Sequence, residues 1–280
     1  MERRLKRVAG IPAYNEEATI AKVIIRARKH VDRVVVIDDG STDDTALIAE
    51  ALGALVVRHE QKRGYGAAIR SCFKVARDLK ANVLVTLDAD GQHDPDQMPR
   101  LVEPVNDGSA DLVLGSRFLK TSDARQAPRY RKAGIRLLTR LTKGASRAQF
   151  SDAQSGFRAY SQRVFEQILP TEEGMGVSVE ILMKATEHSF RILEVPVTVR
   201  YRGLKTSTQN PFYHALEVAA YVVDELIRIV LAKSVAIEAS KGPVPPGHQG
   251  GSCERFQVPL EDALDTRVRS IGREHAVDNV

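Results

Sequence analysis

Two carboxylates, Asp88 and Asp90, directly follow an apolar stretch of the sequence, Val83 to Leu87. Such a stretch is typical of a buried strand, and buried strands seldom end in clustered acids for packing reasons, because an unpaired buried charge is costly. If the chain turns after Asp88, both carboxylates can face one divalent cation, with the amide oxygen of Gln92 nearby. Mg²⁺ prefers such oxygen ligands together with substrate phosphates. A D-x-D sequence is common, however, and a solvated turn is the alternative interpretation.

A second acidic cluster, DDGSTDD, begins at the end of another apolar stretch, Arg33 to Asp38. Ser41 and Asp44 have the spacing of an N-cap and a capping box, which predicts a helix that extends to Leu52. Asp39 is not needed for this cap. Its carboxylate could therefore accept hydrogen bonds from a nucleobase N–H or a ribose hydroxyl.

Strand and helix patterns alternate along the first half of the chain, and this alternation places both acidic clusters at strand ends. Strands are expected at 8–11, 33–38, 54–58, 83–87 and 112–115. Helices are expected at 18–29, from the cap at Ser41 to Leu52, at 64–79 and at 95–105. The second half predicts helices at 157–168, 177–188 and 211–233 and a strand at 190–201. The pattern indicates an α/β fold with a mainly parallel twisted sheet and helices on both faces. Ligands bind outside the carboxyl ends of such strands, so one crevice could receive all the polar clusters.

Composition narrows the class of protein. The 280 residues suffice for one large domain or two small ones, and the net charge of +5 favours acidic partners such as phosphates, anionic lipid or nucleic acid. Cys72 and Cys253 are too few for a disulfide framework, and the N-terminus does not resemble a signal peptide, so we expect a reducing cytoplasmic compartment. No apolar stretch reaches the length of a membrane span.

Seven short sequences resemble, in order and spacing, those of family-2 glycosyltransferases with the GT-A fold. They are IPAYNEE, VIDDGSTDDT, RGYGAAIRSCF, LDADGQHDP, LGSRF, DAQSGFRAYS and EVPVTVRYR. Each is a weak signal by itself, but seven in order are a strong one. The resemblance covers roughly residues 8–205 and is greatest to dolichyl-phosphate mannosyltransferases and related polyprenyl-phosphate sugar transferases. It implies a metal-dependent inverting transfer of a sugar from a nucleotide-diphosphate sugar to a polyprenyl phosphate.

The resemblance also implies the residues of the site. The base and ribose of the nucleotide would be held by Pro12, Tyr14, Glu16, Ile37 and Asp39, and Ala89 would pack beside the nucleotide. The implied cofactor, Mg²⁺ or Mn²⁺, would bind Asp88, Asp90 and Gln92 together with the donor diphosphate. Phosphate or sugar would be contacted by Arg117, Arg202 and Lys205, and the family's D-x-x-S-G-F-R pattern is matched by Asp152, Ser155 and Arg158. Catalytic roles are thus predicted for Asp90, Arg117, Arg131 and Asp152.

Arg131 is included because it lies in the basic segment 117–147, which contains ten lysines and arginines and one acidic residue, Asp123. A basic helix with a leucine face suits an anionic membrane surface, although a helix packed on the sheet is the alternative. Arg131 and Lys132 would then grip the acceptor phosphate at the cytoplasmic face of a membrane. We expect a GT-A domain at 1–207 that includes this segment, a C-terminal amphipathic helix at 208–238, and a flexible Pro- and Gly-rich tail at 239–280.

Several alternatives remain open. The stretch YRKAGIRLLTRL has Gly134 and Arg136 where the family usually carries a serine and an asparagine, which leaves the acceptor undecided. An acceptor hydroxyl would need a general base, either Asp152 or Glu180, although Glu180 is more simply an ordinary polar helix position. His93 and His188 are expected on surface turns or helix ends.

Three other functions compete with the transfer to a lipid phosphate. One is a family-2 glycosyltransferase with a soluble hydroxyl acceptor. A sugar nucleotidyltransferase is another, but it needs a basic, glycine-rich loop where this chain has the acidic IPAYNEE. The last is a non-enzymatic basic protein that binds nucleic acid or membrane, although the acidic crevice disfavours a phosphate backbone there.

Overall fold

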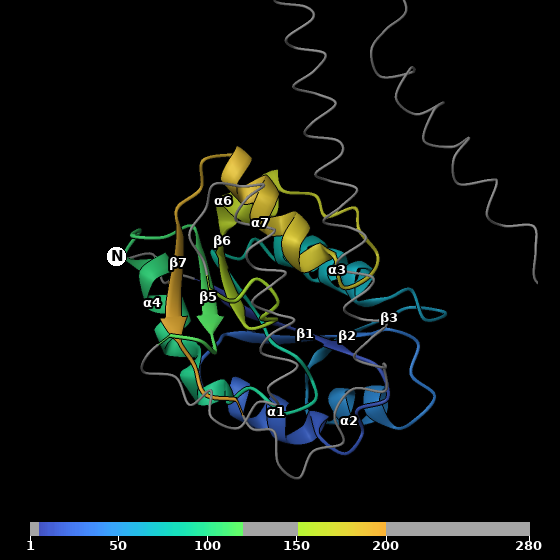
Figure 1. The fold of residues 1–280 in the computed structure, drawn as a ribbon. Helices are drawn as coiled ribbons and strands as arrows, with labels where there is room; N and C mark the ends of the chain where they lie inside the picture. The colour runs from blue at the N-terminus through green and yellow to red at the C-terminus, as the bar shows by residue number, and fades with distance from the viewer. Residues whose placement is uncertain (1–5, 120–150, 200–280) are drawn as a thin grey trace, which may run out of the picture. The chain divides into compact units, whose positions relative to one another are not determined.

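Figure 1 shows the computed structural model of the chain, which describes residues 6–119 and 151–199. The strands of this part are β1 (Arg7–Ala13), β2 (Arg33–Asp38), β3 (Leu55–Arg58), β4 (Val83–Thr86), β5 (Leu112–Ser116), β6 (Arg158–Ser161) and β7 (Ile192–Pro196). They form one seven-stranded sheet of order β3-β2-β1-β4-β6-β5-β7. β6 is antiparallel to β4 and β5, and the other neighbours are parallel. The predicted α/β fold with a mainly parallel sheet is confirmed.

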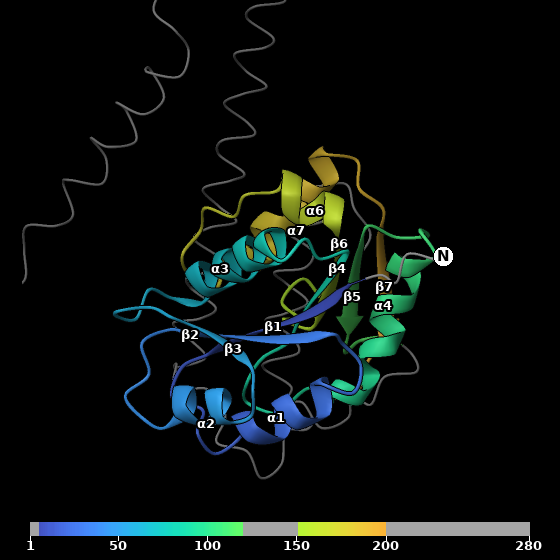
Figure 2. The ribbon, with the colours of Figure 1, turned by 180° about the vertical axis from the view of Figure 1, so that it is seen from behind.

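Helices cover both faces of the sheet, as the two opposite views in Figures 1 and 2 show. One face carries α1 (Ile20–Ala27), α2 (Thr45–Ala51) and α4 (Met98–Asn106), which follows the short 3₁₀ helix η1 (Pro95–Gln97). The opposite face carries α3 (Tyr65–Asp78), α6 (Gln162–Gln167) and α7 (Val177–Glu187). The described part is therefore a three-layer arrangement with the sheet in the middle.

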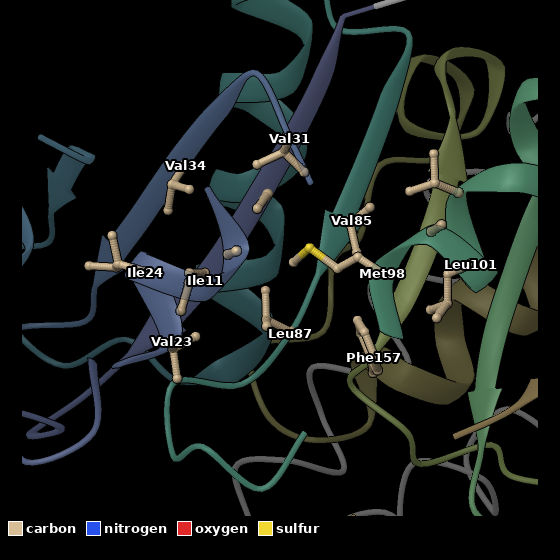
Figure 3. Packing of buried hydrophobic residues seen from close by; sticks show 14 of the residues in the cluster. Ile11, Val23, Ile24, Val31, Val34, Val85, Leu87, Met98, Leu101 and Phe157 are labelled. Carbon is tan, nitrogen blue, oxygen red and sulfur yellow. The ribbon is translucent and has the colours of Figure 1, made fainter. Parts of the chain in front are cut away.

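Apolar side chains of the helices pack against those of the sheet. Figure 3 shows one cluster, in which Ile11 of β1 lies beside Val23 and Ile24 of α1, while Met98 of α4 lies beside Val85 of β4. Burying each large aliphatic side chain of this kind stabilises the fold by about 1.5–3 kcal/mol. The buried residues of α1 recur at helical spacing: Ile20, Val23, Ile24 and Ala27.

β4 is buried on both sides, which explains its uninterrupted apolar sequence. Val83 and Val85 belong to the cluster under α1 and α4, whereas Leu84 belongs to the cluster under α3, α6 and α7. The hydroxyl of Thr86 donates to the carbonyl oxygen of Gly156 at 2.9 Å, so that β4 is tied to the segment before β6. A strand fixed in this way gives Asp88, which follows it, a rigid base.

Two predicted elements differ from the structure. Residues 158–161 were expected in a helix at 157–168 but form β6, because each of them pairs with β4, and tertiary pairing overrides local propensity. The helix expected after Ser41 begins only at Thr45, and the hydroxyl of Ser41 instead accepts a hydrogen bond from the backbone N–H of Asn15 at 2.9 Å.

Several predictions concern residues outside the described ranges. They are the basic segment beyond Leu119, the amphipathic helix 208–238, the tail 239–280, Arg131, Lys132, Arg202, Lys205 and Cys253. In the part of the chain that the structure describes, no helix has both the length and the apolar character needed to cross a bilayer.

Candidate active site

Polar residues gather where β1, β2, β4 and β5 end and where the antiparallel β6 begins. Ala13, the last residue of β1, pairs with Asp38 of β2, so Tyr14 and Asp39 follow neighbouring strands at the same edge. Asp88 follows β4 on the other side of β1, and Arg117 follows β5. The expected crevice edge is therefore built from segments that are far apart in the sequence.

The loops after β1 and β2 are joined by hydrogen bonds. The side-chain oxygen of Asn15 accepts from the N–H of Thr42 at 2.9 Å, and the N–H of Glu16 donates to the hydroxyl of Thr45 at 2.7 Å. Asn15 itself has a φ of 55°, a conformation that asparagine tolerates better than most residues. These contacts fix Tyr14 and Glu16 on either side of a rigid turn.

Asp39 organises the loop 59–64. Its buried carboxylate accepts from the backbone N–H groups of Arg63 and Gly64, both at 2.9 Å, and lies 2.7 Å from Nδ1 of His59. A carboxylate has about four lone-pair positions, so roughly one remains for a ligand. The base-binding role of Asp39 stays a prediction, and the structure adds a second role in shaping the loop beside it.

The loop that Asp39 holds places Lys62 against Tyr14. The ammonium group of Lys62 lies 4.0 Å from the centroid of the Tyr14 ring, a cation–π geometry. Gly40 makes this approach possible: it has a φ of +76°, and a Cβ there would lie 2.8 Å from the backbone nitrogen of Lys62. Sequence reasoning missed Lys62, because nothing in HEQKRG distinguishes it from an ordinary solvated lysine.

Asp88 is half-buried and is contacted by two other segments of the chain. The hydroxyl of Tyr65 donates to its Oδ1 at 3.2 Å. A Cβ at Gly156 would lie 2.6 and 2.8 Å from the two carboxylate oxygens, so a side chain there would displace them. Burial raises the pKa of Asp88 and the negative charge of Asp90 raises it further, while burial and Asp90 also raise the pKa of Glu16. Three acidic groups therefore repel one another at this edge.

The donor set fits a hard divalent cation. Such a cation would relieve the charge repulsion between Asp88 and Asp90. In the turn from Asp90 to Gln92, Oδ1 of Asp90 accepts a hydrogen bond from the N–H of Gln92 at 2.9 Å. Within residues 6–119 and 151–199, no cluster of three or more His, Cys, Asp or Glu side chains is placed to hold a metal alone. Substrate phosphate oxygens and water would have to complete the coordination, as is usual for Mg²⁺.

Arg117 and Asp152 form a buried, two-pronged ion pair. Nε and Nη2 of Arg117 lie 2.6 Å from the two carboxylate oxygens of Asp152, and the N–H of Arg117 donates to Oδ2 at 3.0 Å. Burial by itself would raise the pKa of Asp152, but the charge and hydrogen bonds of Arg117 outweigh it and lower the pKa below its ordinary value. The carboxylate is thus ionised and largely occupied by its partner.

The segment before β6 is held from several sides. Glu194 of β7 accepts from the N–H groups of Ser151 and Asp152 at 2.8 and 3.0 Å. Arg158 is buried, and its guanidinium donates to the carbonyl oxygens of Ala153, Ser155 and Ser178. The structure therefore places Asp152 and Ser155 near the crevice, whereas the guanidinium of Arg158 is hydrogen-bonded to backbone carbonyl oxygens.

Comparison with known proteins identifies the class of this site. The family model described as "Glycosyl transferase family 2" matches residues 9–169, which include every site segment from Tyr14 to Arg158. The chain belongs to glycosyl transferase family 2.

Relatives in this family are similar over most of the chain. The UDP-N-acetylglucosamine--dolichyl-phosphate N-acetylglucosaminyltransferase of Methanococcus voltae is 32% identical over 212 residues, which cover 68% of this chain and 84% of that protein. The polyprenol monophosphomannose synthase of Mycolicibacterium smegmatis is 30% identical over 71% of this chain and 79% of its own length.

Solved structures agree with the predicted GT-A fold. The glucosyl-3-phosphoglycerate synthase of Mycobacterium tuberculosis, in complex with Mn²⁺, UDP and phosphoglyceric acid, superimposes with a TM-score of 0.63 at 26% identity. The match covers 79% of this chain and 78% of that one. The predicted fold and enzyme class are confirmed, and membership of this family replaces the nucleotidyltransferase alternative.

Two expectations about this family-2 enzyme's site are wrong. Glu180 is not a solvated helix position: it is 1% exposed and accepts from the N–H of Thr171 at 2.7 Å, the N–H of Glu172 at 2.9 Å and Nζ of Lys184 at 2.7 Å. His93 is not on a surface turn: its ring packs 5.2 Å from that of Phe157, and burial lowers its pKa to about 3.

Three of the other predicted residues are apolar and lie at the same edge. Pro12, Ile37 and Ala89 are buried at the ends of β1, β2 and β4, where they form an apolar wall. Gln92 is also buried, while His188 lies exposed at the end of α7, as expected. The nucleotide-binding and metal-binding roles of these residues stay predictions.

Proposed function

We propose that this family-2 glycosyltransferase transfers a sugar from a nucleotide-diphosphate sugar to a polyprenyl phosphate, with inversion at the anomeric carbon and with Mg²⁺ or Mn²⁺ as cofactor. The observation that carries the proposal is the acidic pair Asp88 and Asp90 at the end of β4, with Asp88 oriented by Tyr65 and backed by Gly156. Relatives named for dolichyl-phosphate and polyprenol substrates support the choice of acceptor.

The donor would lie across the ends of the strands. Its base and ribose would occupy the side of Tyr14, Glu16 and Asp39, against the apolar wall of Pro12, Ile37 and Ala89. Its diphosphate would reach Asp88 and Asp90, where a bound divalent cation supplies Lewis-acid stabilisation of the leaving nucleoside diphosphate. Positive charge for the same leaving group is proposed for Arg117, Arg202 and Lys205.

Both carboxylates that were considered as general bases are engaged by other groups, which supports a phosphate acceptor. Asp152 is occupied by Arg117, and Glu180 by Lys184 and the backbone of Thr171. A phosphate oxygen is already anionic and needs no base. It would attack the anomeric carbon from the face opposite the diphosphate, forming one C–O bond as the bond to the diphosphate breaks. A hydroxyl acceptor would have to lose a proton, and neither Asp152 nor Glu180 would be available to accept it.

The site of action is proposed to be the cytoplasmic face of an anionic membrane, where the lipid phosphate would be presented to a peripheral enzyme. The support is the composition of the segment 117–147, with Arg131 and Lys132, and of the helix expected at 208–238. The proposed organisation is a catalytic part at 1–207 with the helix and the tail 239–280 following it. No nucleic-acid partner is proposed.

A radiochemical assay tests the proposal. The protein would receive labelled UDP-glucose, UDP-N-acetylglucosamine or GDP-mannose with Mn²⁺ and a short-chain polyprenyl phosphate in detergent, and label in the lipid fraction would be measured. We expect transfer that excess EDTA abolishes and that the matched polyprenol, which lacks the phosphate, does not support.

A soluble acceptor is the second candidate, because the neighbour described above was solved with phosphoglyceric acid. Transfer to 3-phosphoglycerate or to the polyprenol, with none to the lipid phosphate, would overturn the proposed acceptor. Liposome flotation at low salt tests the membrane separately: protein that stays at the bottom of the gradient contradicts a peripheral membrane enzyme.

A further inference from the structure

Gln154 carries a buried amide to which no residue in the described part of the chain is hydrogen-bonded. It lies in the turn 151–157 before β6, and the residue is only 9% exposed. Neither its oxygen nor its nitrogen has a hydrogen-bond partner among the residues that the structure describes. Burying a polar group without a partner costs free energy, and such groups are rare enough in native proteins that each needs an explanation.

The turn around Gln154 is not loosely packed. Arg158 donates to the carbonyl oxygens of both neighbours, Ala153 and Ser155, at 2.7 Å each. The N–H of Asp152 is bonded to Glu194 at 3.0 Å. The backbone on both sides of Gln154 is therefore fixed, and the unsatisfied amide does not result from a segment that lacks a defined position.

The turn lies between the two charged parts of the site. On one side, Asp152 is bonded through both oxygens to Arg117. On the other side, the backbone of Gly156 lies against the carboxylate of Asp88: a Cβ added at Gly156 would lie 2.6 Å from Oδ1 of Asp88. Gln154 is two residues from each of these contacts, so it belongs to the same edge as the proposed diphosphate and metal contacts.

The chemistry of an amide indicates what it binds. Phosphate oxygens only accept hydrogen bonds, and cationic side chains or a metal serve them better. Sugar hydroxyls both donate and accept, and a glutamine amide offers two donors and one acceptor. We propose that Gln154 binds hydroxyl groups of the sugar that is transferred, and that it is a residue that determines sugar selectivity. This inference rests on the proposed function.

A binding experiment separates the sugar from the nucleotide. Affinities would be measured by calorimetry with Mn²⁺ for UDP against UDP-glucose and UDP-N-acetylglucosamine, and for GDP against GDP-mannose. Gln154→Leu is expected to bind the nucleoside diphosphate like the wild type but the corresponding nucleotide sugar about tenfold more weakly, which corresponds to one or two lost hydrogen bonds. Gln154→Asn, which keeps the amide one methylene shorter, should give a smaller loss.

The matched control is Gln167→Leu, the same substitution at an exposed position of α6, which should change neither affinity. Deoxy analogues of the preferred donor sharpen the test, because removal of the hydroxyl that Gln154 binds should weaken the wild type but not Gln154→Leu. Melting curves establish that each variant is folded, and Gln154→Asn carries the test if the leucine variant is not.

The outcomes are distinct. Equal losses for diphosphate and nucleotide sugar, or no loss for either, would overturn the assignment of Gln154 while leaving the proposed function intact. A leucine variant that melts higher and binds every donor like the wild type would show that the amide is a tolerated defect or is hydrated, which also overturns it. If the wild type binds no nucleotide sugar, the proposed function and this inference fail together.

Discussion

The hydroxyl of Tyr65, the first residue of α3, donates a hydrogen bond to Oδ1 of Asp88, which follows β4. The backbone of Gly156, just before β6, closes the other side of the same carboxylate. Three separate segments thus determine where one acid points. A carboxylate held in this way loses little conformational entropy when it binds a cation, which is what a site assembled before its ligand arrives requires.

Tyr65→Phe tests the value of this hydrogen bond. The phenylalanine fills the same space but cannot orient Asp88, and loss of a bond to the ionised carboxylate disfavours that form. We expect the Mn²⁺ concentration that half-saturates nucleotide binding to rise about threefold to tenfold, consistent with a bond worth roughly 1 kcal/mol. A thermal-shift titration of Mn²⁺ with UDP or GDP measures it. An unchanged titration would show that Tyr65 does not position the acid.

Gly156→Ala tests the close approach of backbone and carboxylate. The new methyl group would stand 2.6 Å from Oδ1 of Asp88 and 2.7 Å from the Tyr65 hydroxyl, so both must move. We expect transfer to fall by about a hundredfold, since small misplacements of reacting groups have effects of that size. Gly108→Ala is the control for a glycine substitution, because nothing lies within 4 Å of its added Cβ, although its φ of +75° will cost some stability.

Lys62→Met tests whether the loop shaped by Asp39 belongs to the nucleotide site. The ammonium group over Tyr14 would lie next to a base or phosphate held there, so its removal should weaken binding of UDP or GDP about threefold to tenfold. The melting temperature should change little, because Lys62 is exposed. Lys29→Met, at an exposed position after α1, is the control, and equal effects of the two substitutions would contradict the assignment.

The first five strands of the sheet could be predicted because the signal for each strand lies within its own short sequence. These strands are short, mostly apolar runs, and the polar residues at their ends follow them directly in the sequence, as Asp88 follows β4. β6 could not be predicted in the same way. Its four residues, RAYS, form a strand because β4 and β5 accept them on both sides, which is a property of the assembled sheet.

The contacts of the site depend on long-range pairing and were beyond sequence reasoning. The types of Arg117 and Asp152 suggested chemistry, but their mutual occupation across 35 positions appears only in the fold. The same holds for Asp39, whose carboxylate is bonded to the backbone 24 and 25 residues later. Charged residues at strand ends were correctly placed at the edge, whereas their partners were not foreseen.

Glu180→Gln tests a structural role through its pH dependence. Burial raises the pKa of Glu180, but hydrogen bonds from Lys184 and Thr171 outweigh it, and the folded-state pKa lies below the ordinary 4.5. A lowered carboxyl pKa contributes stability above the unfolded-state pKa and loses it as pH falls through the folded-state pKa. The variant should therefore be less stable than the wild type by about 1–3 kcal/mol at pH 6–8, and the difference should shrink below pH 4.5.

Urea unfolding at a series of pH values measures this difference. Glu187→Gln, an exposed position on the same helix, should match the wild type throughout. A Glu180 variant that is fully stable but has lost transfer to a hydroxyl acceptor would instead restore Glu180 as a general base.

Asp152→Asn distinguishes a positioning role from a catalytic one. If Asp152 serves mainly to hold Arg117, the amide breaks a buried ion pair, and stability should fall by about 3–5 kcal/mol because the guanidinium is left without its counter-charge. Transfer to a lipid phosphate by the fraction that remains folded should fall less than about tenfold. A general base would behave differently: its loss typically costs about 10²–10⁴ in rate, with no requirement that stability change.

The double substitution Arg117→Met with Asp152→Leu completes the argument. Replacing both partners of a buried ion pair by apolar residues of similar size is often neutral for stability, so the double variant should recover most of the stability that Asp152→Asn loses. It should nevertheless lose transfer, because the positive charge proposed to face the leaving diphosphate is gone. Recovery of stability without activity would assign the charge of Arg117 to catalysis and Asp152 to its orientation. Recovery of both would remove the pair from the mechanism.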